Sequence, residues 1–336
     1  MQPVKIGIIG CGLAATNLHW PALQKLPEQF KITMVCDTLE AKAQEFARLS
    51  GNVPYVTDPR QVLENPDIEA IDVVLPVNLH YSMARKVLEA DKHLFIEKPL
   101  AGDLKEARRL RDLEGKYPCV KMVGENFRYR KALVRVKEHL NSGAIGAPLT
   151  AICSLLCQFD VPNNPFAQTT WRRQHQFPGG IVTDVGIHWA AQLRFLFGDL
   201  HITGAFCQSF DSAIGKLDSI SFQFSTPQSL RGVANLFLGA KDYFQDGVTV
   251  LGREGTLVGG QHGPNFGDFR ISISRGGKTT EEIIEHDTGM QEEFNDFYCA
   301  IRTGGQVKSS FKEAYLDLKV ILDGLELAKR TQGDTG

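Results

Sequence analysis

The stretch VKIGIIGCGLAA, residues 4–15, joins an apolar strand to a turn that contains Gly10, Gly12 and Ala15. This spacing is G-x-G-x-x-A, the pattern of a dinucleotide-binding turn. In such a turn the first glycine permits the tight bend and the second lets the backbone approach a pyrophosphate. The small third residue lets the next helix pack closely, and the N-terminus of that helix favours the phosphate charge. The stretch therefore predicts a strand, a phosphate-binding turn and a helix.

Outward from this turn, short apolar runs alternate with amphipathic segments as far as residue 123. The runs FKITMVCD, AIDVVLP and HLFIEKP are each followed by a segment with helical periodicity. Strands that alternate with helices at this pitch form βαβ units, and right-handed crossovers assemble such units into a parallel sheet with helices on both faces. We therefore predict a doubly wound, Rossmann-type domain for residues 1–123.

The second apolar run ends in Asp37, at about the separation from the turn where a carboxylate accepts hydrogen bonds from the adenosine ribose hydroxyls. Asp37 could instead only cap the helix that follows. Because strand, turn, helix, strand and acid occur in order, the sequence favours nucleotide binding. The carboxylate would repel a 2′-phosphate, so NAD is expected in preference to NADP. Lys42 lies close enough in sequence to weaken that preference, which keeps NADP as the alternative.

Polar residues also follow two later strands. AIDVVLPVNLH ends with Pro76, Asn78 and His80, and LFIEKP ends with Glu97 and Lys98. In a doubly wound sheet, ligands bind outside the carboxyl ends of the strands, so both groups should face one crevice. Ordinary turn residues would look similar after AIDVV. We expect these residues to line the cofactor site.

The hydrophobic pattern changes in residues 124–336, which contain longer alternating runs such as SISFQFS, SLRGVANLFLG and DFRISISRGG. Their turns are rich in Gly, Pro and Asn, which predicts a mostly antiparallel sheet. A last helix is expected at about 311–331, packing across the other elements. The fold class is thus α/β, with an N-terminal Rossmann domain and a C-terminal α/β domain that holds an open, mostly antiparallel sheet.

Composition excludes several classes of function. The chain has 336 residues, 43% of them hydrophobic, and a formal net charge of −2 without a basic block for nucleic acid. We find no apolar run of about 18 residues and no signal-peptide layout, so we expect a cytoplasmic protein that does not bind membranes. The seven cysteines are expected to be reduced, and no metal site is predicted because Cys153 and Cys157 lack a second ligand pair. A small-molecule partner is favoured.

The motifs GIIGCGLAA, CD at 36–37, LPVNLH, IEKPLAG and GGIVTDVGIH together resemble the glucose-fructose oxidoreductase and inositol dehydrogenase family, Gfo/Idh/MocA. They occur in the family's order and spacing, over nearly the entire chain. The resemblance implies NAD(P)-dependent dehydrogenases or reductases of sugars, polyols and related hydroxy compounds. It also implies that residues 124–336 bind substrate and that the outer face of their sheet forms oligomer contacts, here in a homodimer or homotetramer.

The same resemblance assigns residues around the cofactor. It places Glu97 and Lys98 beside the nicotinamide and implies a cis peptide bond before Pro99. It further implies that Asn126 contacts the nicotinamide end and that Trp171 and Arg172 reach the cofactor, with packing roles as the alternative. The complete expected cofactor-binding set is Gly10, Gly12, Leu13, Ala14, Ala15, Asp37, Thr38, Leu75, Pro76, Asn78, His80, Glu97, Lys98, Asn126, Trp171 and Arg172.

The motif GGIVTDVGIH carries Asp184 and His188, whose separation of four puts both on one face of a helix, about one turn apart. The glycines at 179 and 180 would let that helix begin close to a ligand. The alternative is an ordinary N-terminal acid followed by a surface histidine. In the family's commonest pattern a further Asp stands three residues after the histidine, but here that residue is Ala191, which puts one substrate contact in doubt.

Hydride removal from an alcohol carbon requires a nearby base for the hydroxyl proton. We expect His188 to be that base, Lys98 to stabilise the developing alkoxide charge, and Asp184 to orient substrate or tune the other two. Arg128 and Tyr129 are further candidates for substrate contact, with packing as the alternative. Two rival functions stay open: an NADPH-dependent reductase of keto-sugars or other carbonyl compounds, and a non-catalytic regulator that binds NAD(H).

Overall fold

The computed structural model describes residues 1–174, 177–263 and 265–333. The chain divides into two compact units. The first consists of Met1–Asn126 together with Met290–Tyr315, and the second consists of Phe127–Gly289 together with the chain from Leu316 onward. The sequence had assigned residues 290–315 to the second domain, whereas in the structure they belong to the first unit. The α/β class is confirmed.

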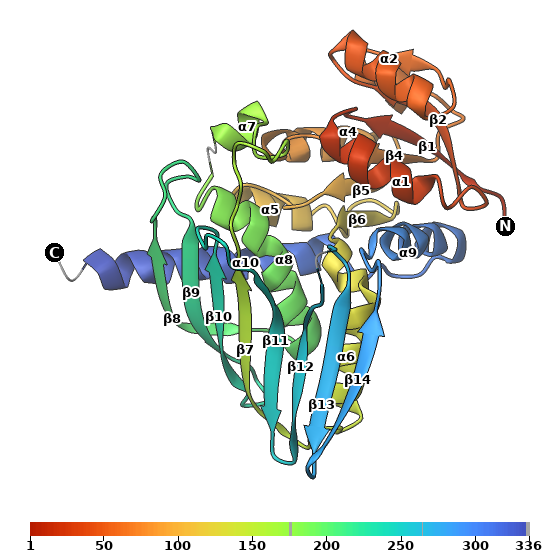
Figure 1. Cartoon of the computed structure of the whole chain (residues 1–336). Helices are drawn as coiled ribbons and strands as arrows, with labels where there is room; N and C mark the ends of the chain where they lie inside the picture. The colour runs from red at the N-terminus through yellow and green to blue at the C-terminus, as the bar shows by residue number, and fades with distance from the viewer. Residues whose placement is uncertain (175–176, 264, 334–336) are drawn as a thin grey trace. The chain divides into compact units, whose positions relative to one another are not determined.

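The first unit is built on a six-stranded parallel sheet in the order β3-β2-β1-β4-β5-β6 (Figure 1). This is the predicted Rossmann topology. The central strands are buried on both faces: Ile8, Ile71 and Phe95 have no exposed surface, which explains why these runs are continuously apolar. The strands are β1 Val4–Ile9, β2 Phe30–Cys36, β3 Tyr55–Val56, β4 Ala70–Val73, β5 His93–Glu97 and β6 Lys121–Gly124.

Helices connect these strands. Two of them begin at aspartates whose side chains accept backbone N–H groups of the first turn, Asp58 before α3 and Asp103 before α5. The helix after β1 starts with a π-helical turn, η1, which is a rare element that often occurs at functional sites. The helical elements are η1 Ala15–His19, α1 Trp20–Leu23, α2 Glu40–Leu49, α3 Pro59–Leu63, η2 Val77–Leu79, α4 His80–Glu89, α5 Leu104–Arg111, η3 Asn126–Tyr129 and α9 Met290–Thr303.

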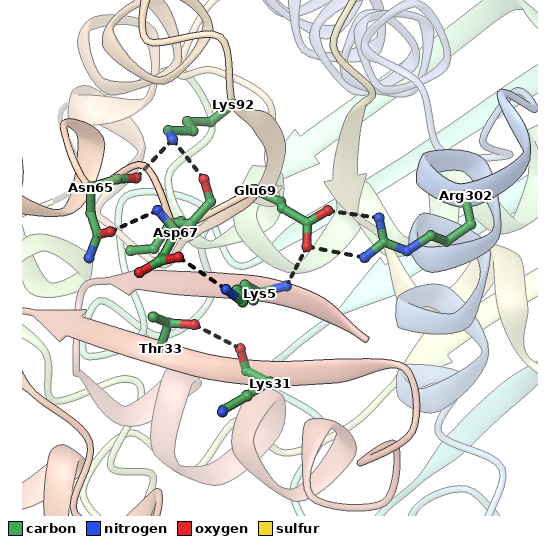
Figure 2. A network of polar contacts seen from close by, with 9 residues as sticks. Lys5, Lys31, Thr33, Asn65, Asp67, Glu69, Lys92 and Arg302 are labelled. Atoms are coloured by element: carbon green, nitrogen blue, oxygen red, sulfur yellow. Dashed lines mark hydrogen bonds and ion pairs between the residues drawn. The ribbon is translucent and has the colours of Figure 1, made fainter. Parts of the chain in front are cut away.

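Helix α9 belongs to the first unit because it is attached there by both polar and apolar contacts. Arg302 donates to both carboxylate oxygens of Glu69, at 2.7 and 3.1 Å, and Glu69 also accepts the backbone N–H of Lys5 on β1 (Figure 2). At the other end of α9, Phe294 stacks on Phe95 with ring centroids 4.5 Å apart. Residues nearly 200 positions apart thus share one core.

The second unit contains an eight-stranded sheet in the order β14-β13-β12-β11-β7-β10-β9-β8 (Figure 1). All neighbouring pairs are antiparallel except β7 and β10, so the predicted mostly antiparallel sheet is confirmed. Along β10, buried and half-exposed residues alternate, as expected for a sheet with one covered face. The strands are β7 Pro148–Leu156, β8 His201–Gln208, β9 Ser219–Ser225, β10 Arg231–Phe237, β11 Gln245–Gly252, β12 Gly255–Gln261, β13 Phe269–Arg275 and β14 Lys278–Ile284.

Four helices complete the described chain: α6 Lys131–Asn141, α7 Thr170–Arg173, α8 Ile181–Phe197 and α10 Phe311–Gly333. Helix α6 packs against β12 and β13 and also against α8. Helix α10 starts at the predicted residue and continues two residues beyond the predicted end. In the part of the chain that the structure describes, no helix is long and apolar enough to span a bilayer.

Candidate active site

The predicted phosphate turn has the backbone that its glycines allow. Gly10 has a φ of +104°, and a Cβ built there would lie 2.1 Å from the carbonyl oxygen of Val74, so this position accepts only glycine. A Cβ at Gly12 would meet no atom within 4 Å, which leaves open space beside that peptide. Ala15 is buried under the helix start. The turn therefore fits a pyrophosphate that approaches the backbone at Gly12.

Asp37 ties this turn to the end of β2. One of its carboxylate oxygens accepts the N–H of Cys11 and the other accepts the N–H of Leu39, each at 2.9 Å. The acid thus supports the turn and the segment before α2. It does not cap that helix, because the N-cap residue is Leu39 and the first turn has no side-chain cap hydrogen bond. A carboxylate oxygen accepts more than one hydrogen bond, so these contacts are compatible with ribose hydroxyls as further donors. Thr38 beside it is exposed.

The loop after β4 contains the next group of predicted cofactor residues. Leu75 and Pro76 are half-buried and Asn78 is exposed, whereas His80 has no exposed surface. The ring nitrogens Nε2 and Nδ1 of His80 lie 2.9 and 3.3 Å from the carbonyl oxygens of Leu75 and Leu100. Burial lowers the pKa of His80 and favours its neutral form. Its side chain therefore joins two backbone loops at this edge of the sheet instead of lying at the surface.

Glu97 and Lys98 stand at the carboxyl end of β5, beside the neighbouring ends of β4 and β6. The Lys98–Pro99 peptide bond is cis, which confirms the expectation from the family resemblance. Glu97 Oε2 accepts the backbone N–H of Lys98 at 3.0 Å. Asn126, just after β6, is buried and 5% exposed.

Three ionisable side chains that no sequence motif indicated lie close to this strand end. His19, Asp72 and Glu293 are each at most 1% exposed. His19 Nδ1 lies 2.8 Å from Asp72 Oδ2, and Nε2 lies 2.6 Å from Glu97 Oε1. A signal was present in AIDVV, because an acid inside a strand that is buried on both faces requires a partner. Nothing in the sequence indicated which residue that partner was.

In the second unit, helix α8 presents Asp184 and His188 one turn apart, as predicted. It begins after Gly179 and Gly180, which have φ values of +78° and +52°. Asp184 is 2% exposed and accepts a hydrogen bond from Arg172 Nε at 2.7 Å.

The guanidinium of Arg172 also lies 4.2 Å from the ring centroid of Trp171. The structure therefore brings together Trp171, Arg172 and Asp184, which the sequence had assigned separate roles. The Arg172 cation compensates the charge of the buried Asp184 carboxylate.

The His188 imidazole lies against an aromatic ring that no sequence motif indicated. Phe127 stacks on it with ring centroids 4.6 Å apart and an interplanar angle of 21°. The guanidinium of Arg130 lies 5.1 Å from the centroid of the same Phe127 ring. Ala191, which replaces the family's usual aspartate, is fully buried in α8. A carboxylate at this position would need a buried partner.

Arg128 and Tyr129, the other candidates for substrate contact, are 4% and 3% exposed. Arg128 donates to Asp317 at 2.5 Å, and Arg194 donates to the same carboxylate oxygen at 2.8 Å. Burial raises the pKa of Asp317 and the two arginines oppose that rise. Arg128 thus belongs to a charge network with Arg194 and Asp317 inside the second unit.

Comparison with known proteins agrees with this architecture. Residues 4–125 match the family described as "Oxidoreductase family, NAD-binding Rossmann fold", and residues 133–258 match the "GFO/IDH/MocA C-terminal domain". The chain belongs to the Gfo/Idh/MocA family. As a member of the Gfo/Idh/MocA family it is an oxidoreductase with an NAD(P)-binding Rossmann domain.

Two curated Gfo/Idh/MocA relatives carry names that state a sugar substrate. The dTDP-3,4-didehydro-2,6-dideoxy-alpha-D-glucose 3-reductase of Saccharopolyspora spinosa is 30% identical over 90% of this chain and 89% of its own. The levoglucosan dehydrogenase of Pseudarthrobacter phenanthrenivorans is 31% identical over 61% of this chain and 54% of its own. Among solved structures, an oxidoreductase of Thermotoga maritima superposes with a TM-score of 0.89 at 28% identity and covers 97% of both chains.

Proposed function

We propose that the protein transfers a hydride between a nicotinamide cofactor and a hydroxyl-bearing or carbonyl carbon of a sugar, polyol or related small molecule. The observation that carries this proposal is helix α8, which presents Asp184 in an ion pair with Arg172 and His188 one turn later. An acid paired with an arginine, one turn from a partly exposed imidazole, suits the orientation and deprotonation of a hydroxyl group. The relatives named for sugar substrates support the same class.

In this proposal the protein's own residues hold and move the hydroxyl proton. His188 takes it during oxidation and returns it during reduction. Lys98 donates a hydrogen bond to the same oxygen and stabilises negative charge there. Because Arg172 compensates its charge, Asp184 is assigned to orienting the substrate. Arg128 and Tyr129 are assigned to supporting the second unit from inside, since both are buried.

The bound nicotinamide would supply or accept the hydride. The residues proposed to hold the cofactor are those of the turn at Gly10 and Gly12, Asp37 for the ribose, and the strand ends that follow. For the buried His80 we propose a supporting contact to the backbone of these loops. We also propose the cofactor contacts that the family resemblance implies for Trp171, Arg172 and Asn126.

Reduction of a keto-sugar with NADPH is the second candidate function. The printed name of the Saccharopolyspora spinosa relative, a 3-reductase of a didehydro sugar, favours it. The contacts of Asp37 favour NAD instead, because a 2′-phosphate would meet its carboxylate. A regulator that binds NAD(H) without turnover is the third alternative, to be distinguished by experiment.

We also propose a cytoplasmic homodimer or homotetramer that associates through the second sheet. Large apolar side chains on its strands are exposed to solvent, including Ile152 at 43%, Phe206 at 49% and Val258 at 45%. Exposed apolar side chains on a sheet favour contact with another surface.

The test is to follow nicotinamide absorbance with aldoses, inositols and keto-sugars, using NAD and NADP forms in both directions. Lys98→Ala should lower kcat by about 100-fold or more while the Kd for NAD stays within twofold, because a donor to the reacting oxygen is removed. The matched control is Lys105→Ala, which removes an exposed lysine from α5. Wild-type turnover in Lys98→Ala would remove Lys98 from the chemistry.

His188→Ala tests the base separately. If only KM rises and the pH profile of kcat is unchanged, His188 is a binding residue. No turnover by the wild-type protein across the panel, with cofactor still bound, would favour the regulator.

A further inference from the structure

His19 occupies an internal position between two carboxylates that come from different strands of the first unit. Its ring is 1% exposed, and its two nitrogens lie 2.8 Å from Asp72 on β4 and 2.6 Å from Glu97 at the end of β5. His19 is the last residue of the π-helical turn η1. Three elements that are distant in sequence therefore meet at one imidazole.

The geometry indicates the charge state of this imidazole. A neutral imidazole has one N–H donor, so its second nitrogen would direct a lone pair at a carboxylate oxygen. A protonated ring donates to Asp72 and Glu97 at once. Burial alone would lower the pKa of His19, but the charges and hydrogen bonds of the two carboxylates outweigh burial and raise it well above its usual value. The two carboxylate contacts and the raised pKa therefore favour the imidazolium form of His19.

The described surroundings of His19 include two aromatic rings and a further buried acid. The rings of Phe95 and Phe294 meet it edge-on, with centroids 5.7 and 5.4 Å away. The fully buried Glu293 has a pKa raised well above its usual value, chiefly by burial and further by Glu97, Glu125 and Asp72, although His19 opposes this shift. These effects favour the neutral form of Glu293. Burial raises the pKa of Asp72 as well, and His19 opposes that rise. Within this cluster, His19 faces both carboxylates with one ring nitrogen each.

Glu97 links this buried charge to Lys98. Its Oε1 faces His19, and its Oε2 accepts the backbone N–H of Lys98 at 3.0 Å. Both oxygens of one carboxylate are therefore held, one by a ring from η1 and one by the peptide that follows β5. The Glu97 side chain is 14% exposed. Its carboxylate can therefore turn toward solvent if the imidazolium is lost.

We propose that His19 is a positioning residue, which holds the Glu97 carboxylate in place and thereby sets the direction in which Lys98 leaves the end of β5. Its effect on turnover rests on the role proposed above for Lys98. Its effect on charge and on the Lys98 side chain does not. If His19 only filled space in the core, its burial would be explained. The contacts of its two ring nitrogens with Asp72 and Glu97 would not be.

The first measurement concerns the wild-type protein and needs no variant. Imidazole ¹⁵N and ¹H shifts, assigned by comparison with His19→Gln, should show His19 protonated on both nitrogens throughout a titration from pH 6 to pH 8. A neutral His19 at pH 7 would overturn the proposal.

The second measurement compares His19→Gln with Phe294→Leu. Glutamine retains one donor and similar volume but loses the charge, whereas Phe294→Leu disturbs packing at the same place without removing either hydrogen bond. We expect His19→Gln to lower kcat at least tenfold with the Kd for NAD within twofold, and Phe294→Leu to change kcat less than threefold. Equal kcat losses in the two variants would mean that His19 acts through packing alone.

A third readout works without substrate. Acetylation of each lysine is followed by mass spectrometry in the same variants. In His19→Gln the rate at Lys98 should fall at least threefold, because the Glu97 carboxylate without its imidazolium attracts the ammonium of the next residue, while the rate at Lys105 stays constant. An unchanged rate at Lys98 would overturn the proposal even if the wild-type protein turned over none of the substrates.

If His19→Gln does not fold, Glu97→Gln breaks the same link from the other side. Lys98 labelling should then rise at least threefold, because Lys98 loses the carboxylate that holds its backbone and no negative charge remains there to attract its ammonium. Unchanged labelling in that variant would also overturn the proposal. Absence of wild-type turnover, by contrast, would count only against the proposed function.

Discussion

Among single residues, Asp37 shows how one carboxylate has both a structural and a recognition role. It accepts the N–H groups of Cys11 and Leu39, so it stabilises the phosphate turn before any ligand binds. Its negative charge also stands at the end of β2, where a dinucleotide fold places the adenosine ribose. Replacing Asp37 therefore changes loop support and cofactor discrimination together, and a second variant is needed to separate them.

We expect Asp37→Ser to weaken NAD binding by about tenfold or more, since a hydrogen bond to a charged group contributes about 1.5–3 kcal/mol, and to strengthen NADP binding. Asp37→Asn is the matched control, because it keeps one oxygen acceptor and the side-chain size but removes the charge. Fluorescence titration of both variants with NAD and NADP measures the Kd values. A Kd for NADP that stays constant in both variants would contradict the assigned ribose contact.

Within the elements, α8 depends on the glycines that precede it. A Cβ on Gly179 would lie 2.3 Å from Thr183 Oγ1 and 2.6 Å from Leu325 Cδ1, and the residue has a φ of +78°. Thr183 Oγ1 in turn donates to the carbonyl of Pro178 at 2.7 Å. The start of the helix, and hence the position of Asp184, is set by contacts that only glycine permits.

Gly179→Ala should therefore lower the free energy of unfolding by about 2–4 kcal/mol, through backbone strain and overpacking combined. Gly143→Ala provides the control. Gly143 has a similar φ of +72° in the same unit, but a Cβ there would meet nothing within 4 Å. Gly143→Ala should lower the free energy of unfolding by only about 1 kcal/mol. Urea denaturation of both variants measures the difference, and equal losses would show that the close contacts at Gly179 contribute nothing.

For the whole molecule, the central feature is the return of the chain to its first unit through α9. Arg302 binds both oxygens of Glu69, and Phe294 stacks on Phe95. The Arg302 hydrogen bonds lower the pKa of Glu69. Its ionised form is therefore preferred in the folded state. This stabilisation is present above the unfolded-state pKa of about 4.3 and is lost as the pH falls through the lower folded-state value.

Glu69→Gln should reduce the free energy of unfolding at pH 7 by about 0.5–1 kcal/mol, a modest figure because the pair is partly solvent-exposed. The difference from wild type should shrink as the pH approaches about 4, where the carboxylate begins to take up its proton. The control is Glu89→Gln, which removes an exposed partner of Arg85 on α4. It should lower the free energy of unfolding by about 0.3 kcal/mol. A pH-independent loss in Glu69→Gln would assign the effect to packing.

Most of the fold and part of the candidate site were predictable from local patterns. Gly10, Gly12 and Asp37 lie within one βαβ unit, and Asp184 and His188 lie within one helix, so sequence spacing alone placed each group. By contrast, nothing local indicated that Phe127 stacks on His188 or that Arg172 pairs with Asp184. Those contacts depend on how separate segments pack.

Strand alternation, glycine spacing and a family motif are local properties. They were therefore enough to predict the parallel and antiparallel sheets, the phosphate turn and the cis bond before Pro99. By contrast, the packing of distant segments places α9 in the first unit and His19 between Asp72 and Glu97, and no local pattern indicates either. The reason is physical: a buried charge must find its partner, and that partner can come from any segment that folding brings into contact.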